Sequence, residues 1–117
     1  MDNSSILEKL KEAVEETCSE LGFLADGMEI KYSHLCGQTT DVGFGTEKPS
    51  NNSEVIDVII VKNPYRSNGW NVLIYGIESC LSEFFMENIR KKCPEMYVFE
   101  GHQFWDNKEF IYIYISF

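Results

Sequence analysis

The chain has few positive charges. Its 117 residues include ten lysines and arginines against 19 aspartates and glutamates, which gives a net charge of −9 at pH 7. Such an acidic protein is repelled by nucleic-acid phosphates and by the anionic surface of membranes. We therefore expect neither nucleic acid nor membrane among its partners. By charge, the partner is a basic protein or a cation, or the protein has no partner.

Long apolar runs are also absent. No segment approaches the roughly 20 apolar residues that a membrane-spanning helix needs. The opening residues, MDNSSILEKLKEAVEE, lack the basic start and the apolar stretch of a signal peptide. We therefore expect a cytoplasmic protein whose four cysteines are reduced thiols rather than disulfides. Of these, Cys18 and Cys80 are expected on the apolar faces of helices.

No catalytic, phosphate-binding or metal-binding motif is recognisable. Gly43-Phe44-Gly45 has neither the Lys-Ser/Thr ending of a Walker A loop nor the third glycine of a dinucleotide fingerprint. His34 and Cys36 form a single H-x-C pair, whereas structural zinc sites use two such pairs. Cys36 as a nucleophile with His34 as its base would still need an oxyanion hole in the same cleft. We therefore predict no enzyme, no cofactor and no metal.

What the chain does contain is enough apolar material for one folded domain over residues 1–117. Hydrophobic residues make up 44% and aromatic residues 14% of the sequence. Periodicity and turn signals predict an α+β fold in the order α-β-β-β-β-α-β-β, with two amphipathic helices on a mostly antiparallel sheet. The predicted helices are 5–21 and 78–92, the predicted strands are 28–35, 39–44, 55–61, 70–75, 96–105 and 109–117, and a flexible loop is predicted at 45–54.

Several local signals support these boundaries. Ser5 and Glu8 fit a capping box, and Gly22 supplies a helix stop. The β-branched segment 55–61 suits a strand covered on both faces, with Asp57 as its polar interruption. Asn68-Gly69 indicates a turn. The second helix carries a predicted apolar stripe of Ile77, Leu81, Phe84, Phe85 and Ile89.

The last two strands are predicted to form a hairpin around Asp106-Asn107-Lys108. Side chains should alternate along the final strand. One face would carry Phe110, Tyr112 and Tyr114, and the other would carry Ile111, Ile113, Ile115 and Phe117.

The first helix presents a row of acidic residues opposite its apolar face. These residues are Glu8, Glu12, Glu15, Glu16 and Glu20. Such a row is commonly a solvated surface, and lysines could partly neutralise it, Lys9 with Glu12 and Lys11 with Glu8 or Glu15. The alternative is an electrostatic docking surface for a basic partner.

Two hypotheses of function follow. The first is a non-catalytic binding module, most specifically a cytoplasmic immunity or inhibitor protein that neutralises a basic toxin or nuclease. The five glutamates would steer the encounter, and Trp70, Trp105, Tyr112 or Tyr114 would anchor it. The second is a small enzyme or ligand-binding domain with a pocket between the second helix and the sheet. Its polar lining would be His34, Cys36, Asp57 and His102.

Overall fold

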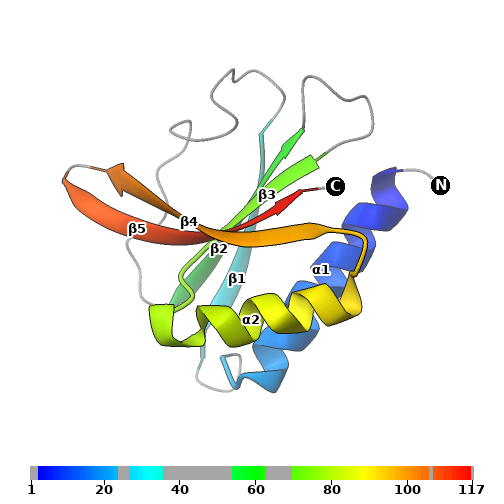
Figure 1. The fold of residues 1–117 in the computed structure, drawn as a ribbon, viewed down its shortest axis with the longest axis horizontal. Helices are drawn as coiled ribbons and strands as arrows, with labels where there is room; N and C mark the ends of the chain where they lie inside the picture. Colours follow the sequence, from blue (N-terminus) through cyan, green and yellow to red (C-terminus); the bar gives the residue numbers. More distant parts are fainter. Residues whose placement is uncertain (1–2, 24–26, 36–53, 63–69, 106, 117) are drawn as a thin grey trace.

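The structure, a computed structural model, describes residues 3–23, 27–35, 54–62, 70–105 and 107–116. Within them the chain forms a five-stranded sheet and two helices (Figure 1). The elements are α1 (Asn3–Glu20), β1 (Glu29–Leu35), β2 (Val55–Lys62), β3 (Trp70–Tyr75), α2 (Ser79–Lys92), β4 (Tyr97–Trp105) and β5 (Lys108–Ser116). The predicted α+β fold is confirmed. The predicted strand 39–44, residues 45–53 of the predicted loop and the turn at Asn68-Gly69 lie outside the described residues.

The strands follow the order β1-β2-β3-β5-β4 across the sheet. β1 and β2 run parallel, and every other neighbouring pair is antiparallel. β2 lies inside the sheet, and its residues 56–61 are all buried. This confirms the prediction of a strand covered on both faces, and it places Asp57, with 5% of its surface exposed, in the interior.

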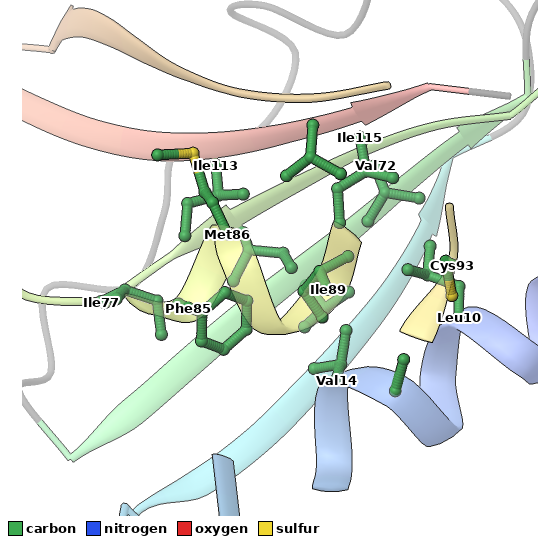
Figure 2. Packing of buried hydrophobic residues seen from close by; sticks show 14 of the residues in the cluster. Leu10, Val14, Val72, Ile77, Phe85, Met86, Ile89, Cys93, Ile113 and Ile115 are labelled. Carbon is green, nitrogen blue, oxygen red and sulfur yellow. The ribbon is translucent and has the colours of Figure 1, made fainter. Parts of the chain in front are cut away.

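Both helices pack on the same face of the sheet (Figure 1). Figure 2 shows the core between the helices and the sheet, where α1 and α2 direct apolar side chains toward the strands. The buried side chains labelled there include Leu10, Val14, Phe85, Met86, Ile89, Val72, Ile113 and Ile115. Burying a side chain of this size stabilises the fold by roughly 1.5–3 kcal/mol, so this cluster is the main source of stability.

The assignment of one residue to the predicted apolar stripe of α2 is wrong. Phe84 is 59% exposed, and Met86 is buried in its place. At about 100° per residue, Phe84 lies some 150° from the middle of the arc formed by Phe85, Met86 and Ile89. Cys80 is likewise exposed rather than on an apolar face, whereas Cys18 and Cys93 are buried free thiols.

The ends of α1 differ in how well the sequence predicts them. The helix begins at Asn3, so the predicted start at Ser5 is wrong by two residues and Ser5 lies inside the helix. At the other end Gly22 adopts φ +82°, as a helix stop requires. The Phe23 N–H donates to the Cys18 carbonyl oxygen at 3.0 Å, and the Gly22 N–H donates to that of Ser19 at 3.1 Å. These two bonds form a Schellman motif.

β4 and β5 form the predicted hairpin. Trp105 pairs with Lys108 across a two-residue turn, in which Asn107 has φ 66°. The predicted alternation of β5 is confirmed: Ile113 and Ile115 face the helices, and Tyr112 packs with Tyr75 in a second cluster, away from them. Neither α1 nor α2 is long and apolar enough to cross a bilayer.

Candidate partner-binding surfaces

The five glutamates lie on the outer face of α1. The same helix buries Leu10, Ala13, Val14 and Cys18 against the core, so its 3.6-residue period leaves the acidic positions in solvent. The side chains of Glu8, Glu16 and Glu20 are 73%, 57% and 51% exposed. The predicted acidic face therefore exists as a surface.

Lys92, at the end of α2, partly neutralises this surface. Its Nζ lies 2.9 Å from Glu20 Oε1 and 3.5 Å from Glu16 Oε2. The hydrogen bond to Glu20 is the largest cause of the raised pKa of Lys92. The two glutamates therefore link the helices, a role that the sequence did not suggest, because Lys92 is 72 residues from Glu20.

The two lysines of α1, Lys9 and Lys11, form ion pairs with different parts of the molecule. Lys9 Nζ lies 2.9 Å from Glu95 Oε1 and so connects α1 to the segment before β4, not to Glu12 as the helical spacing suggested. Lys11 does meet Glu8, at 3.9 Å, and it also lies 5.4 Å from the centre of the Tyr32 ring.

Glu15 has a neutral partner. The Tyr32 hydroxyl on β1 donates to Glu15 Oε1 at 3.0 Å. Burial is the largest cause of the raised pKa of Tyr32, and the Glu15 carboxylate adds to it by favouring the protonated hydroxyl. This bond ties α1 to the sheet but leaves the charge of Glu15 in place.

Glu12 is distinct from the other four. It forms no ion pair with another of the described residues, and it lines a shallow hollow of about 150 Å³ beside α2. The other residues of the hollow are Lys9, Ala13, Glu16 and Lys92. The acidic face of α1 and its ion-pair partners together comprise six carboxylates (Glu8, Glu12, Glu15, Glu16, Glu20 and Glu95) and three lysines (Lys9, Lys11 and Lys92), so this surface has a net charge of 3 − 6 = −3.

Three of the four predicted aromatic anchors, Trp70, Tyr112 and Tyr114, have described side chains, and all three are buried or half-buried. Trp70 is half-buried against the core on the helix side of the sheet. Tyr112 is 8% exposed and belongs, with half-buried Tyr114, to the cluster on the opposite face. The side chain of Trp105 lies outside the described part of the chain. The structure therefore places Tyr112 and Tyr114 on the face of the sheet that lies away from α1 and its acidic residues.

Other aromatic side chains are exposed that the sequence analysis did not single out as anchors. Tyr97, Phe99 and Phe104 of β4 are 74%, 50% and 68% exposed. Phe99 stacks on Tyr114 with ring centres 4.8 Å apart, so Tyr114 does belong to an exposed aromatic surface. The sequence did contain a signal for Tyr97 and Phe99. Side chains alternate along a strand, so the burial of Val98 on the helix side places both of its neighbours on the other face of the sheet.

The residues of the alternative pocket do not converge. Asp57 alternates with Ile56 and Val58, which face the helices, so it lies on the opposite face of the sheet. His102 of β4 lies between Glu100 of the same strand and Glu109 of β5, with nitrogen–oxygen distances of 3.3 and 3.5 Å.

Glu100 accepts a hydrogen bond from the Ser82 hydroxyl of α2 at 2.6 Å, which places Glu100, and His102 two residues on, on the helix side of the sheet. Asp57 and His102 thus lie on opposite faces. Cys36 and the side chain of His34 lie outside the described residues.

The space between α2 and the sheet holds apolar side chains, as Figure 2 shows. Among the described residues no three His, Cys, Asp or Glu side chains are grouped as metal ligands would be. These observations give the pocket hypothesis no support.

No protein family model, curated protein sequence or solved structure matches this chain. The function therefore has to be argued from the surfaces described above.

Proposed function

We propose that this protein is a non-catalytic binding module, and specifically a cytoplasmic immunity or inhibitor protein that neutralises a basic toxin or nuclease. The observation that carries the proposal is the exposed acidic face of α1, which stays net negative after its lysine partners are counted. The overall charge of −9 acts in the same direction, because it attracts a basic protein from a distance.

The hollow beside Glu12 suggests how the contact is made. A lysine or arginine side chain of the partner would enter it and meet the carboxylates of Glu12 and Glu16. Lys92 already lies 3.5 Å from Glu16, so an incoming cation would share or replace that contact. Glu12 has no ion-pair partner within the described chain, so a new ion pair at Glu12 would replace the fewest existing contacts.

The test compares two variants of equal net charge. In the first, Glu12, Glu16 and Glu20 on α1 are changed to lysine; in the second, Glu83, Glu87 and Glu109, which are also exposed, are changed to lysine. Each variant carries −9 + 6 = −3, so only the position of the charge differs. Both are checked by circular dichroism, because the first set also removes the Lys92 pairs.

Wild-type protein and both variants are used to capture partners from the native lysate at low salt, with elution by a salt gradient. We expect one stoichiometric basic protein that wild type and the second variant retain and the first variant loses. With the purified partner, the first variant should associate more slowly and with weaker salt dependence. Co-expression of wild type, but not of the first variant, should then relieve the growth inhibition that the partner causes.

The opposite results are equally informative. An unchanged association rate for the α1 variant would remove the helix from the mechanism. A captured partner that is harmless to cells and keeps its full activity in the complex would contradict the inhibitor role while leaving a binding module.

A further inference from the structure

The outer edge of β4 lacks several features that usually prevent an edge strand from pairing with another strand. β4 is last in the strand order, and no strand among the described residues pairs with its outer side. Natural edge strands are commonly blunted by lysine, proline or bulges. The nine residues Tyr97–Trp105 contain no lysine, arginine or proline, and their one-to-one pairing with β5 has no bulge. The strand also carries exposed Tyr97, Phe99 and Phe104.

The pairing with β5 fixes which backbone groups face outward. Trp105 and Lys108 close a two-residue turn, so they form a hydrogen-bonded pair. Because such pairs alternate along an antiparallel ladder, the N–H and C=O groups of Val98, Glu100, His102 and Phe104 point away from β5. One contact agrees: Arg90 Nη2 of α2 donates to the Val98 carbonyl oxygen at 2.6 Å.

We propose that this edge binds the same edge of a second copy of the chain, antiparallel and about a twofold axis at Gly101. In that register Glu100 lies opposite His102 of the second copy, and His102 opposite its Glu100. Val98 lies opposite Phe104 and Phe99 opposite Gln103. All nine residues of both strands are paired, and the outward-pointing residues meet one another, as backbone hydrogen bonding requires.

Side-chain charge favours this register over the registers centred on the neighbouring residues. Centring the axis on Glu100 would set two carboxylates directly opposite each other, which is destabilising in an antiparallel pair. Centring it on His102 would set two imidazoles opposite each other and leave Glu100 facing Phe104. Only the Gly101 axis gives both copies a carboxylate–imidazole pair on the same face of the joined sheet. The Arg90 contact is compatible, because a carbonyl oxygen has a second lone pair.

The first test changes one exposed phenylalanine on the edge and one away from it. Phe104→Lys puts a charge opposite Val98 of the second copy, whereas Phe84→Lys makes the same change on the outer face of α2, where the side chain is similarly exposed. By analytical ultracentrifugation we expect wild type to reach twice the 13.5 kDa mass of one chain. Phe104→Lys should raise the dimer dissociation constant about tenfold or more. Phe84→Lys should leave that constant unchanged.

The second test reads the register directly. In a background with Cys36 and Cys80 changed to serine, a Phe99→Cys chain is mixed with a Gln103→Cys chain and oxidised. Position 99 lies opposite position 103 in the proposed dimer, so the mixed disulfide should form and the Phe99→Cys chain alone should cross-link poorly. A monomer at every concentration, equal effects of the two lysine variants, or preferred 99–99 cross-linking would each overturn the proposal.

Discussion

At the scale of single residues, the thiol of Cys18 shows how burial sets chemistry. Cys18 has none of its surface exposed. Burial is the main cause that raises its pKa from 9.0 to about 12, and the Glu15 carboxylate adds to the shift. The folded state thus holds the proton that the unfolded state loses above pH 9. The resulting stabilisation is fully present below pH 9 and is lost as the pH rises toward 12.

We therefore predict that the free energy of unfolding falls between pH 9 and pH 12, and that Cys18→Ala makes the fall less steep. Urea titrations of both proteins across this range measure the difference. Tyr75 also has a raised pKa because of burial and contributes equally to both proteins. The raised pKa of Tyr32 depends in part on the charge of Cys18, so the difference between the two proteins reports Cys18 together with its effect on Tyr32. Parallel pH profiles for the two proteins would contradict the assignment.

A second residue-scale prediction concerns Gly101 on β4. A Cβ atom there would lie 2.3 Å from Cζ and 2.5 Å from the hydroxyl oxygen of Tyr112, whose ring covers the glycine from β5. Because Tyr112 is buried, its ring has little room to move. Gly101→Ala should therefore lower the free energy of unfolding by about 1–3 kcal/mol.

The cause can be separated by a double-mutant cycle with Tyr112→Leu, read by urea unfolding. The shorter side chain removes the clashing atoms, so Gly101→Ala should cost clearly less in that background. An equal cost in both backgrounds would mean that the loss comes from the strand backbone and not from the ring.

At the scale of elements, the sequence predicted structure best where a repeat of apolar residues was long. The run 55–61 became β2, and the alternation of Phe110 to Ile115 placed β5 correctly between two apolar clusters. Gly22 ended α1 because only a residue that tolerates positive φ fits there. Single-position assignments were weaker: Phe84 matched the spacing of the α2 stripe loosely and is exposed.

The candidate surfaces were predicted less completely, because contacts distant in sequence decide them. The acidic face of α1 followed from the helical period alone. Lys11 was correctly paired with Glu8 from the helical spacing, but the contacts distant in sequence were not predicted: Lys92 and Glu95 reach α1 because α2 packs across it. The position of β4 at the edge of the sheet follows from β5 pairing with β3, which no local pattern shows. Local alternation could have placed Tyr97 and Phe99 on one face of β4, but their exposure depends on this position of the strand in the fold.

At the scale of the whole molecule, the net charge of −9 bears on stability as well as on binding. The surface pairs that partly offset it are exposed, and such pairs contribute little. Repulsion among the carboxylates of α1, four of which follow one another at intervals of four residues, acts over the full helix. Added salt screens this repulsion more than it weakens the few pairs, because the Debye length falls from roughly 30 Å at 10 mM to about 8 Å at 150 mM.

We therefore predict that sodium chloride raises the free energy of unfolding of the wild-type protein across that range. The rise should be smaller in the variant with Glu12, Glu16 and Glu20 changed to lysine, because its net charge is −3 and its α1 row then contains charges of both signs. The variant with Glu83, Glu87 and Glu109 changed to lysine has the same net charge but keeps the α1 row. Urea midpoints at low and high salt therefore distinguish the effect of total charge from the effect of its location. Equal salt effects in the two variants would assign the repulsion to the molecule as a whole. A larger salt effect in the variant that keeps the α1 row would assign the repulsion to α1.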